Sequence, residues 1–398
     1  MKPIFTRKVL SNGMTILHEK RELPVTTIAL TTKIGYGFEP AQIKGISHFI
    51  EHMAFKGTKK RTSEQIASEL EKVGGELNAF TSDELTVFHV KLPSRHLQLG
   101  IDVLSDIFFN PLMKKEELEK ERKVIIEEIK MYHDDPKRYV LDKIKELSYK
   151  PPFGLQGIGT VETLSNMNQE HLLDFHRKNY IASNTILCIV GNNSLNEILE
   201  LVKKIPFKEG KIKNNLVPER IFDKIVEKRN NIQQSNIVVS IPAPTLVDNK
   251  RYAAQLFATI LGEGMSSRLF KEIREKRGLA YAVKSFLDVG VNFGSIDFYV
   301  GTEKGKEETV KELILKEIQK MKDLNEKELD DAKQQLIGGY EVEEEDSRNT
   351  ALKLIIEELC GNASRYYEFE RRIKAVALDG VKEFSKLKDY SYVALVPE

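Results

Sequence analysis

Apolar and polar residues follow the same succession of patterns in both halves of this chain. In the first half, an apolar run at 85–92 predicts a strand, and the helical spacing of apolar residues predicts a long helix at 115–132. In the second half, a strand is predicted at 295–300 and a helix at 310–321, followed by a second glutamate-rich helix that begins at Glu326. The two halves therefore share one order of elements.

Each half also closes with a β-branched strand that follows a helix, at 184–190 in the first half and at 390–396 at the end of the chain. The two glutamate-rich helices align when Leu118 is placed on Leu329, which is an offset of 211 residues. A duplicated α+β unit of about 200 residues explains both observations. Two unrelated α+β domains with a chance similarity are the alternative.

The segment 206–224 contains proline, glycine and asparagine residues among many charges, a composition typical of a linker. It separates a predicted N-terminal domain at 1–205 from a homologous C-terminal domain at 225–398. All eight histidines lie in the first domain. At the offset of 211 residues Glu128 aligns with Gly339, so the second domain is expected to support the site without supplying metal ligands.

Composition and charge exclude several classes of protein. Hydrophobic residues make up 41% of the chain and charged residues 30%, which is typical of a globular protein. The net charge is only +1, so no overall field attracts nucleic acid or anionic lipid, and neither is expected as a partner. The first ten residues lack an apolar segment of signal-peptide length, and no stretch of 18 uncharged apolar residues follows, so an untargeted protein without a membrane span is expected.

Only two cysteines are present, Cys188 and Cys360, and each lies in an apolar run. Two buried thiols in a reducing compartment fit this pattern better than a disulfide framework does. The expected localisation is therefore cytoplasmic.

The segment 45–55 is apolar nearly all round, which predicts a buried helix, but three polar side chains interrupt it. His48 and His52 are four residues apart and therefore share one helix face, and Glu51 leans over the same face. Burying a carboxylate and two imidazoles without partners would cost several kcal/mol, so one metal ion that binds this face explains the pattern. The alternative is a pair of core histidines bonded to backbone carbonyls.

The order His48, Glu51, His52 is the reverse of the common zincin motif and is itself a zinc-peptidase signature. Two ligands from one helix leave a catalytic zinc one protein ligand short, because the fourth position is kept for water. The predicted helix at 115–132 supplies the third. The apolar residues that mark its inward face are Leu118, Val124, Ile125 and Ile129.

Glu121 and Glu128 are seven residues apart on this helix and therefore share another face. Glu128 is predicted to be the third metal ligand. Glu121 is predicted to orient a ligand or to assist water activation. The alternative for both is a solvated face of a glutamate-rich helix.

At these residues the sequence resembles the inverted-motif zinc metallopeptidases, the family of pitrilysin, insulin-degrading enzyme and the mitochondrial processing peptidase with their small bacterial relatives. In that family a glutamate some 75 residues beyond the motif is the third ligand, and Glu128 lies 76 residues beyond His52. The segment 78–84 resembles the family's substrate-binding edge strand, and 274–281 resembles its second-half signature.

The resemblance implies an α+β fold of two homologous domains, each a mostly antiparallel sheet packed with helices, facing each other across a substrate cavity. It also implies a zinc metalloendopeptidase with one Zn²⁺ per chain that hydrolyses short or unfolded peptides, with Glu51 as the general base. Short members pair as homodimers or as heterodimers with a related chain, and some partners lack the metal site. The alternatives are a non-catalytic partner subunit, in which the motif is typically broken, and a structural zinc, which needs four protein ligands.

Two further sets of site residues follow from the resemblance. Asn78, Ala79 and Phe80 lie in a stretch expected to form one edge strand at 76–90, and such a strand takes an extended peptide by backbone hydrogen bonds. A plain core strand is the alternative. Arg274 and Tyr281 are expected to project from the second half toward the cleaved carbonyl, where Tyr281 donates a hydrogen bond to the developing oxyanion.

Overall fold

The computed structural model describes residues 4–208, 210, 212 and 216–398. Five residues of the predicted linker, at 209, 211 and 213–215, lie outside the described residues. The chain forms two compact units, each composed of several segments. Unit 1 contains Met1–Ile129, Gly157–Asn215 and Glu343–Tyr366, and unit 2 contains Lys130–Gln156, Leu216–Val342 and Tyr367–Glu398. The boundaries predicted for the domains, at 205 and 225, remain a prediction.

Unit 1 contains a six-stranded sheet in the order β1-β2-β6-β3-β5-β4. The β2–β6 pair is parallel and every other neighbouring pair is antiparallel. The strands are β1 (Ile4–Val9), β2 (Thr15–Lys20), β3 (Val25–Thr32), β4 (Glu76–Thr81), β5 (Thr86–Pro93) and β6 (Thr185–Gly191).

Helices of the first half of the sequence cover one face of this sheet, and their apolar residues join those of the strands in one core. The helices are α1 (Ile46–Ala54), α2 (Ser63–Glu71), α3 (Leu97–Phe109), α4 (Lys115–Asp134), α6 (Val161–Asn166), α7 (Gln169–Asn179) and α8 (Leu195–Val202). Single turns of 3₁₀ helix occur at η1 (Tyr36–Phe38), η2 (Ala41–Ile43), η3 (Ser94–His96) and η4 (Ala182–Asn184).

Unit 2 contains a five-stranded sheet in the order β7-β11-β8-β10-β9, in which only the β7–β11 pair is parallel. The strands are β7 (Lys224–Arg229), β8 (Ser235–Pro242), β9 (Ala280–Val289), β10 (Gly294–Thr302) and β11 (Ser391–Pro397). The helical elements of this unit that come after β8 along the chain are α9 (Arg251–Gly262), the π-helix η5 (Phe270–Glu275), α10 (Glu307–Lys320), η6 (Met321–Asp323), α11 (Glu326–Glu343), α13 (Phe369–Lys374), α14 (Leu378–Lys382) and η8 (Glu383–Ser385). The 3₁₀ helix η7 (Ala363–Glu368) spans the boundary between the units at Tyr366.

The topology of the two sheets confirms the predicted duplication. The order β7-β11-β8-β10-β9 reproduces β2-β6-β3-β5-β4, with the parallel pair at the same end, and β1 is an addition to the first copy. Helix α4 begins at Lys115 and α11 begins at Glu326, an offset of 211 residues, which is the offset predicted from the leucine alignment. The predicted α+β class with mostly antiparallel sheets is confirmed.

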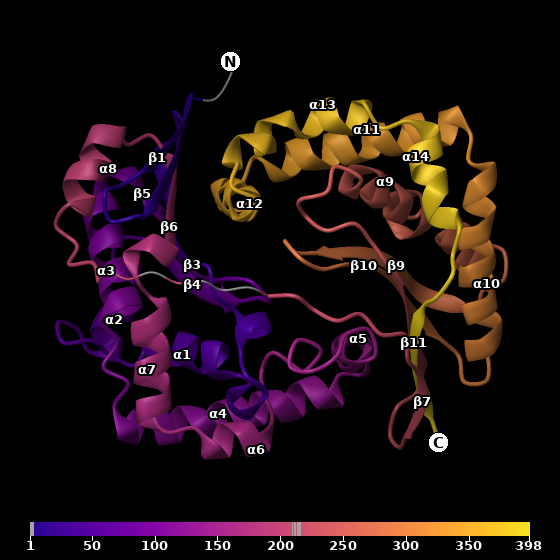
Figure 1. Cartoon of the computed structure of the whole chain (residues 1–398), viewed down its shortest axis with the longest axis horizontal. Helices are drawn as coiled ribbons and strands as arrows, with labels where there is room; N and C mark the ends of the chain where they lie inside the picture. Colours follow the sequence, from indigo (N-terminus) through magenta and orange to yellow (C-terminus); the bar gives the residue numbers. More distant parts are fainter. Residues whose placement is uncertain (1–3, 209, 211, 213–215) are drawn as a thin grey trace. The chain divides into compact units, whose positions relative to one another are not determined.

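One helix in each unit comes from the other half of the sequence. In unit 1, α12 (Ser347–Leu359) packs on β3 and β6 (Figure 1), where the Thr27 and Ser347 hydroxyl oxygens are 2.7 Å apart. In unit 2, α5 (Pro136–Glu146) packs on β8 and β11, which correspond to β3 and β6. Its buried Val140 and Ile144 form a small core with those strands. The second face of each sheet is therefore covered by a helix that comes from the other half of the sequence.

Two expectations about local structure are corrected. The stretch at 76–90 is not one edge strand: β4 is the edge strand, and β5 is an inner strand that follows a turn in which the Ser82 N–H donates to the Leu85 carbonyl at 2.8 Å.

The thiol of Cys188 is buried, and burial raises its pKa. Cys360 is only half-buried, because it caps the C-terminus of α12 instead of lying inside an apolar element.

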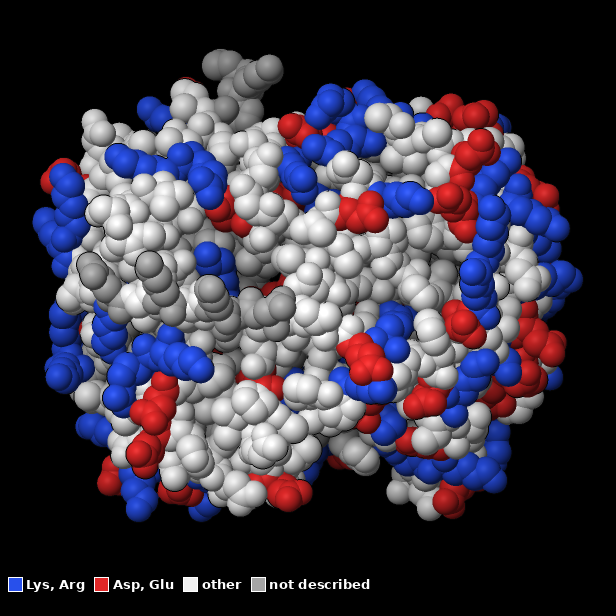
Figure 2. All heavy atoms as spheres, in the orientation of Figure 1, with Lys and Arg blue, Asp and Glu red and all other residues white. Residues whose placement is uncertain are grey.

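Within the described residues, no helix is long and apolar enough to cross a membrane. Both basic and acidic side chains lie on the face shown in Figure 2, in keeping with the 61 basic and 60 acidic residues of the chain.

The packing of α12 on the first sheet can be tested with two residues of the same helix. Leu354 is fully buried, whereas Ile356 is 40% exposed. Leu354→Ala removes buried apolar contacts and leaves a cavity, so we expect the free energy of unfolding to fall by about 2–5 kcal/mol. Ile356→Ala should change it by less than about 0.5 kcal/mol. Urea denaturation followed by circular dichroism measures both, and equal losses would contradict the packing described.

Candidate metal centre

Helix α1 is held at its N-terminus by a buried carboxylate that the sequence did not single out. The backbone N–H groups of Gly45 and Ser47 donate to the two oxygens of Glu39, at 2.8 and 2.7 Å. Burial raises the pKa of Glu39, against the opposing effect of the Lys44 ammonium. Gly45 has a φ of 98°, and a Cβ there would lie 2.5 Å from the carbonyl oxygen of Ile158, so no other residue fits. The position of the helix that follows is thereby fixed.

The predicted helix at 45–55 is confirmed as α1. Its apolar residues Phe49, Ile50 and Met53 are fully buried, whereas the polar residues of the motif are half-buried. The imidazole rings of His48 and His52 are adjacent, with centroids 4.6 Å apart. The four-residue spacing therefore places both rings on one face, as expected.

Helix α4 presents both glutamates on its buried side, which corrects the predicted face. Leu118, Glu121 and Ile125 are its buried residues, while Val124 is 50% exposed. These positions are three and four residues apart, and Glu128 continues the same stripe three residues further on. The prediction was wrong because it included Val124 in the inward face and thereby turned the glutamates away from the core.

The histidines of α1 meet the glutamate of α4. The Oε2 atom of Glu128 lies 3.8 Å from His48 Nε2 and 3.6 Å from His52 Nε2. One ligand atom from each residue can be chosen so that all lie within 4.8 Å of one another, and no other group of three His, Cys, Asp or Glu residues in the described part of the chain does this. The three residues predicted as ligands therefore converge.

This donor set fits zinc. A tetrahedral zinc with ligand bonds of about 2.0–2.2 Å places neighbouring ligand atoms about 3.3–3.6 Å apart. The observed 3.6 and 3.8 Å lie within a few tenths of an ångström of that spacing. Two imidazoles and one carboxylate leave a fourth position for water, which is the composition of a catalytic zinc site and not of a structural one.

A second carboxylate orients one of the rings. Glu121 Oε2 lies 3.1 Å from His52 Nδ1, and Glu121 Oε1 lies 2.6 Å from the Lys56 ammonium. A carboxylate that accepts a hydrogen bond from Nδ1–H fixes the tautomer in which the lone pair of Nε2 is free to bind a metal. Burial lowers the pKa of His52, but the contacts with Glu128 and Glu121 outweigh burial and the pKa is raised overall. The contact of Lys56 with Glu121 was not predicted, although the spacing of four residues between His52 and Lys56 indicates that both lie on the same helix face.

Glu51 stands beside the end of the edge strand. Its Oε2 atom accepts a hydrogen bond of 2.5 Å from the hydroxyl of Thr81, the last residue of β4. Burial raises the pKa of Glu51, and this effect exceeds the lowering by Thr81 and by His52. The contact of Thr81 with Glu51 was not predicted, because nothing in the sequence relates a strand hydroxyl to a helix residue 30 positions earlier.

Asn78, Ala79 and Phe80 lie on β4, the strand at the edge of the six-stranded sheet. The N–H of Ala79 donates to the side-chain oxygen of Asn78 at 2.8 Å. This backbone N–H of the edge strand is therefore hydrogen-bonded to the side chain of the preceding residue. Peptide binding by these three residues remains a prediction.

Arg274 and Tyr281 lie together in unit 2, on η5 and on the edge strand β9. The guanidinium of Arg274 is 4.8 Å from the centre of the Tyr281 ring and donates to the Tyr281 carbonyl at 3.0 Å. The Tyr281 side chain is 77% exposed. Their action on a cleaved carbonyl also remains a prediction.

The fold and the site together define a duplicated α+β protein with a candidate site of two histidines and one carboxylate in its first copy. Comparison with known sequences assigns its family. Residues 14–159 match the family model described as Insulinase (Peptidase family M16), and residues 166–336 match the Peptidase M16 inactive domain. The chain belongs to peptidase family M16, the family whose members the sequence resembles.

Individual relatives agree with this assignment. An "Uncharacterized zinc protease" of Rickettsia felis is 36% identical over 342 residues, covering 84% of this chain and 83% of the relative. "Uncharacterized zinc protease YmxG" of Bacillus subtilis is 31% identical over 406 residues, covering 98% of both chains. The crystal structure of a protease from Helicobacter pylori has the same fold, with a TM-score of 0.92 at 21% identity over 99% of this chain and 100% of that one.

The convergence of the three residues predicts the metal content of point variants. We expect about one zinc per purified wild-type chain, and loss of most of it in His48→Ala and in Glu128→Gln, because each substitution removes a direct ligand. Matched controls are His96→Ala, a histidine outside the cluster, and Glu127→Gln, the exposed neighbour of Glu128 on α4. Elemental analysis after gel filtration measures the content. Wild-type zinc in the two ligand variants would refute the assignment.

Proposed function

We propose that this chain is a zinc-dependent endopeptidase that hydrolyses short or unfolded peptides, with His48, His52 and Glu128 as metal ligands and Glu51 as the general base. The observation that carries the proposal is the approach of ligand atoms from α1 and α4 to within 4.8 Å of one another. The chain's membership of family M16 and the relatives named zinc proteases support it.

His48, His52 and Glu128 would hold the metal, and Glu121 would fix the His52 ring. Zinc bound there would supply a Lewis acid that lowers the pKa of a water molecule and polarises a carbonyl group. Glu51 projects from the same turn of α1 as His52 and would accept the proton of the attacking water and pass it to the leaving amine. Its raised pKa suits this exchange, because a carboxylate with a pKa closer to neutral accepts a proton more readily.

The edge strand supports a peptide as the substrate. A peptide in extended form can add to β4 by backbone hydrogen bonds, and the Ala79 N–H would exchange its Asn78 acceptor for a substrate carbonyl. Recognition through the backbone gives affinity with loose sequence preference. Because Thr81 ends β4 and donates to Glu51, a peptide on this strand would run toward the general base.

Two parts of the proposal rest on the family resemblance alone. Tyr281, with Arg274 packed on its ring, would donate to the oxyanion, and the chain would act as a homodimer or as the active member of a heterodimer. The alternative of a non-catalytic partner predicts a broken motif. Both histidines, the base and the third ligand are present, which favours the active form.

The role of Glu51 predicts a separation of metal binding from turnover. Glu51→Gln keeps the size of the side chain and removes its proton-accepting capacity, so we expect wild-type zinc content and a kcat lower by about 10²–10⁴. Cleavage of a quenched fluorescent peptide library measures turnover, and elemental analysis measures zinc. A chelator should abolish wild-type cleavage, and added zinc should restore it.

Two outcomes would contradict this proposal. Peptide cleavage by Glu51→Gln at the wild-type rate would remove Glu51 from the chemistry. Cleavage by the wild-type protein that survives complete removal of zinc would show that the metal does not take part.

A further inference from the structure

We propose that Lys56 is a positioning residue for the metal site: its ammonium holds Glu121 in the orientation in which that carboxylate accepts a hydrogen bond from His52. The proposal rests on the function proposed above, and it adds a residue to which neither the motif nor the family model gives a role. The ammonium of Lys56 contacts Glu121, which is not one of the three proposed ligands, so its proposed effect on the metal passes through that carboxylate.

The contacts form a continuous chain from the ammonium to the metal position. Lys56 Nζ lies 2.6 Å from Glu121 Oε1, and the other oxygen of this carboxylate lies 3.1 Å from His52 Nδ1. His52 Nε2 then lies 3.6 Å from Glu128 Oε2. Each oxygen of Glu121 therefore has one partner among the described residues, and the two partners together determine the orientation of the carboxylate.

The backbone places Lys56 at the right position for this contact. Lys56 follows His52 by four residues, and its N–H donates to the Met53 carbonyl at 3.1 Å, so the helical turn continues beyond the end of α1. Gly57 then adopts a φ of 112°, which turns the chain away from the helix axis. The Leu112 N–H donates to the Gly57 carbonyl at 3.0 Å and fixes this turn.

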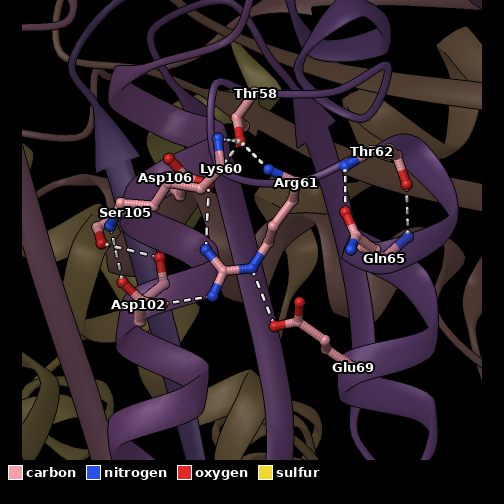
Figure 3. Close-up of polar contacts among 9 residues, drawn as sticks. All are labelled: Thr58, Lys60, Arg61, Thr62, Gln65, Glu69, Asp102, Ser105 and Asp106. Atoms are coloured by element: carbon pink, nitrogen blue, oxygen red, sulfur yellow. Dashed lines mark hydrogen bonds and ion pairs between the residues drawn. The ribbon is translucent and has the colours of Figure 1, made fainter.

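The segment after this turn is clamped to two neighbouring helices (Figure 3). The Thr58 hydroxyl donates to Asp106 on α3 at 2.6 Å. The guanidinium of Arg61 bonds Glu69 on α2 and both Asp102 and Asp106 on α3. Only 9% of the Arg61 side chain and 1% of the Asp106 side chain are exposed, so this contact is shielded from water, whereas Asp102 and Glu69 are partly exposed. The backbone that carries Lys56 is therefore anchored on both of its sides.

Charge and burial decide what Lys56 contributes. Only 8% of the Glu121 side chain is exposed, so its carboxylate needs a charged partner in place of water. Loss of Lys56 could affect zinc binding in two opposite ways. If Glu121 kept its orientation, its negative charge would be less compensated and would attract the zinc ion more strongly. We expect the opposite effect to dominate, because a buried carboxylate that has lost its cationic partner is unstable and turns toward solvent. His52 then loses the acceptor that fixes its ring, and the metal is bound more weakly.

The affinity for zinc tests this role without reference to turnover. We expect Lys56→Met to raise the zinc dissociation constant about tenfold, the lower end of the range for residues behind the ligands, measured by competition with a chromogenic chelator. Lys56→Gln should give the same loss, since it also removes the charge. Lys56→Arg should recover most of the affinity, because the positive charge returns. Lys59→Met, at an exposed lysine three residues away, is the matched control and should bind as the wild type does.

A double-mutant cycle separates positioning from a general effect on the fold. In a Glu121→Gln background, Lys56→Met should change the dissociation constant by less than about twofold, because its partner is gone. The same tenfold loss in that background, or unchanged or tighter binding by Lys56→Met alone, would overturn the proposal. If the wild-type chain does not bind zinc, or if His48→Ala binds it equally well, the proposed function itself fails. If wild-type binding depends on His48 but Lys56→Met binds zinc normally, only the role of Lys56 fails.

Discussion

The approach of two helices from distant parts of the sequence is the constraint on which the candidate metal site depends. Helix α1 contributes two imidazoles at a four-residue spacing, and α4 contributes two carboxylates on one buried stripe. Glu121 contacts the Nδ1 atom of His52 at 3.1 Å, and Glu128 approaches the Nε2 atoms of both histidines. Both contacts join α4 to α1. A shift of α4 by one residue would rotate both carboxylates away from α1, because successive residues point about 100° apart around a helix. The ligand geometry is thus a consequence of how α4 packs.

The second copy has the same fold as the first copy but lacks the candidate metal ligands. It has the same sheet order and a helix α11 that begins at the aligned position. At the positions aligned with Glu121 and Glu128 it has Ala332 and Gly339, and a Cβ built on Gly339 would meet nothing within 4 Å. The duplicated fold therefore conserves topology without conserving ligands. The exchange of α5 and α12 also means that each sheet is completed by the other half of the sequence, so neither half has all the elements of its own unit.

Local patterns in the sequence predicted the parts of this account that arise within one helix or strand. The α1 helix and the pairing of His48 with His52 follow from the helical period of 3.6 residues, and the repeat offset follows from aligning the two glutamate-rich helices; these predictions were confirmed. The inward face of α4 was assigned wrongly, because hydrophobicity alone grouped Val124 with Ile125 and overlooked a buried glutamate. The contacts made by Lys56, Thr81 and Glu39 were not predicted. Lys56 and Thr81 act across contacts between elements distant in the sequence, which form only when the chain has folded, and a Lys or Thr in a sequence is usually a surface residue. Glu39 acts locally, on backbone N–H groups six and eight residues further along the chain, but no pattern in the sequence marked it as buried.

The central claim is that one zinc ion is bound by two imidazoles and a carboxylate in the first copy of the fold. X-ray absorption spectroscopy at the zinc edge of the purified protein tests it most directly. We expect the zinc to be surrounded by nitrogen and oxygen atoms only, at about 2.0–2.2 Å, with the multiple-scattering signature of two imidazoles. A shell that contains sulfur at about 2.3 Å, or one without imidazole scattering, would contradict it.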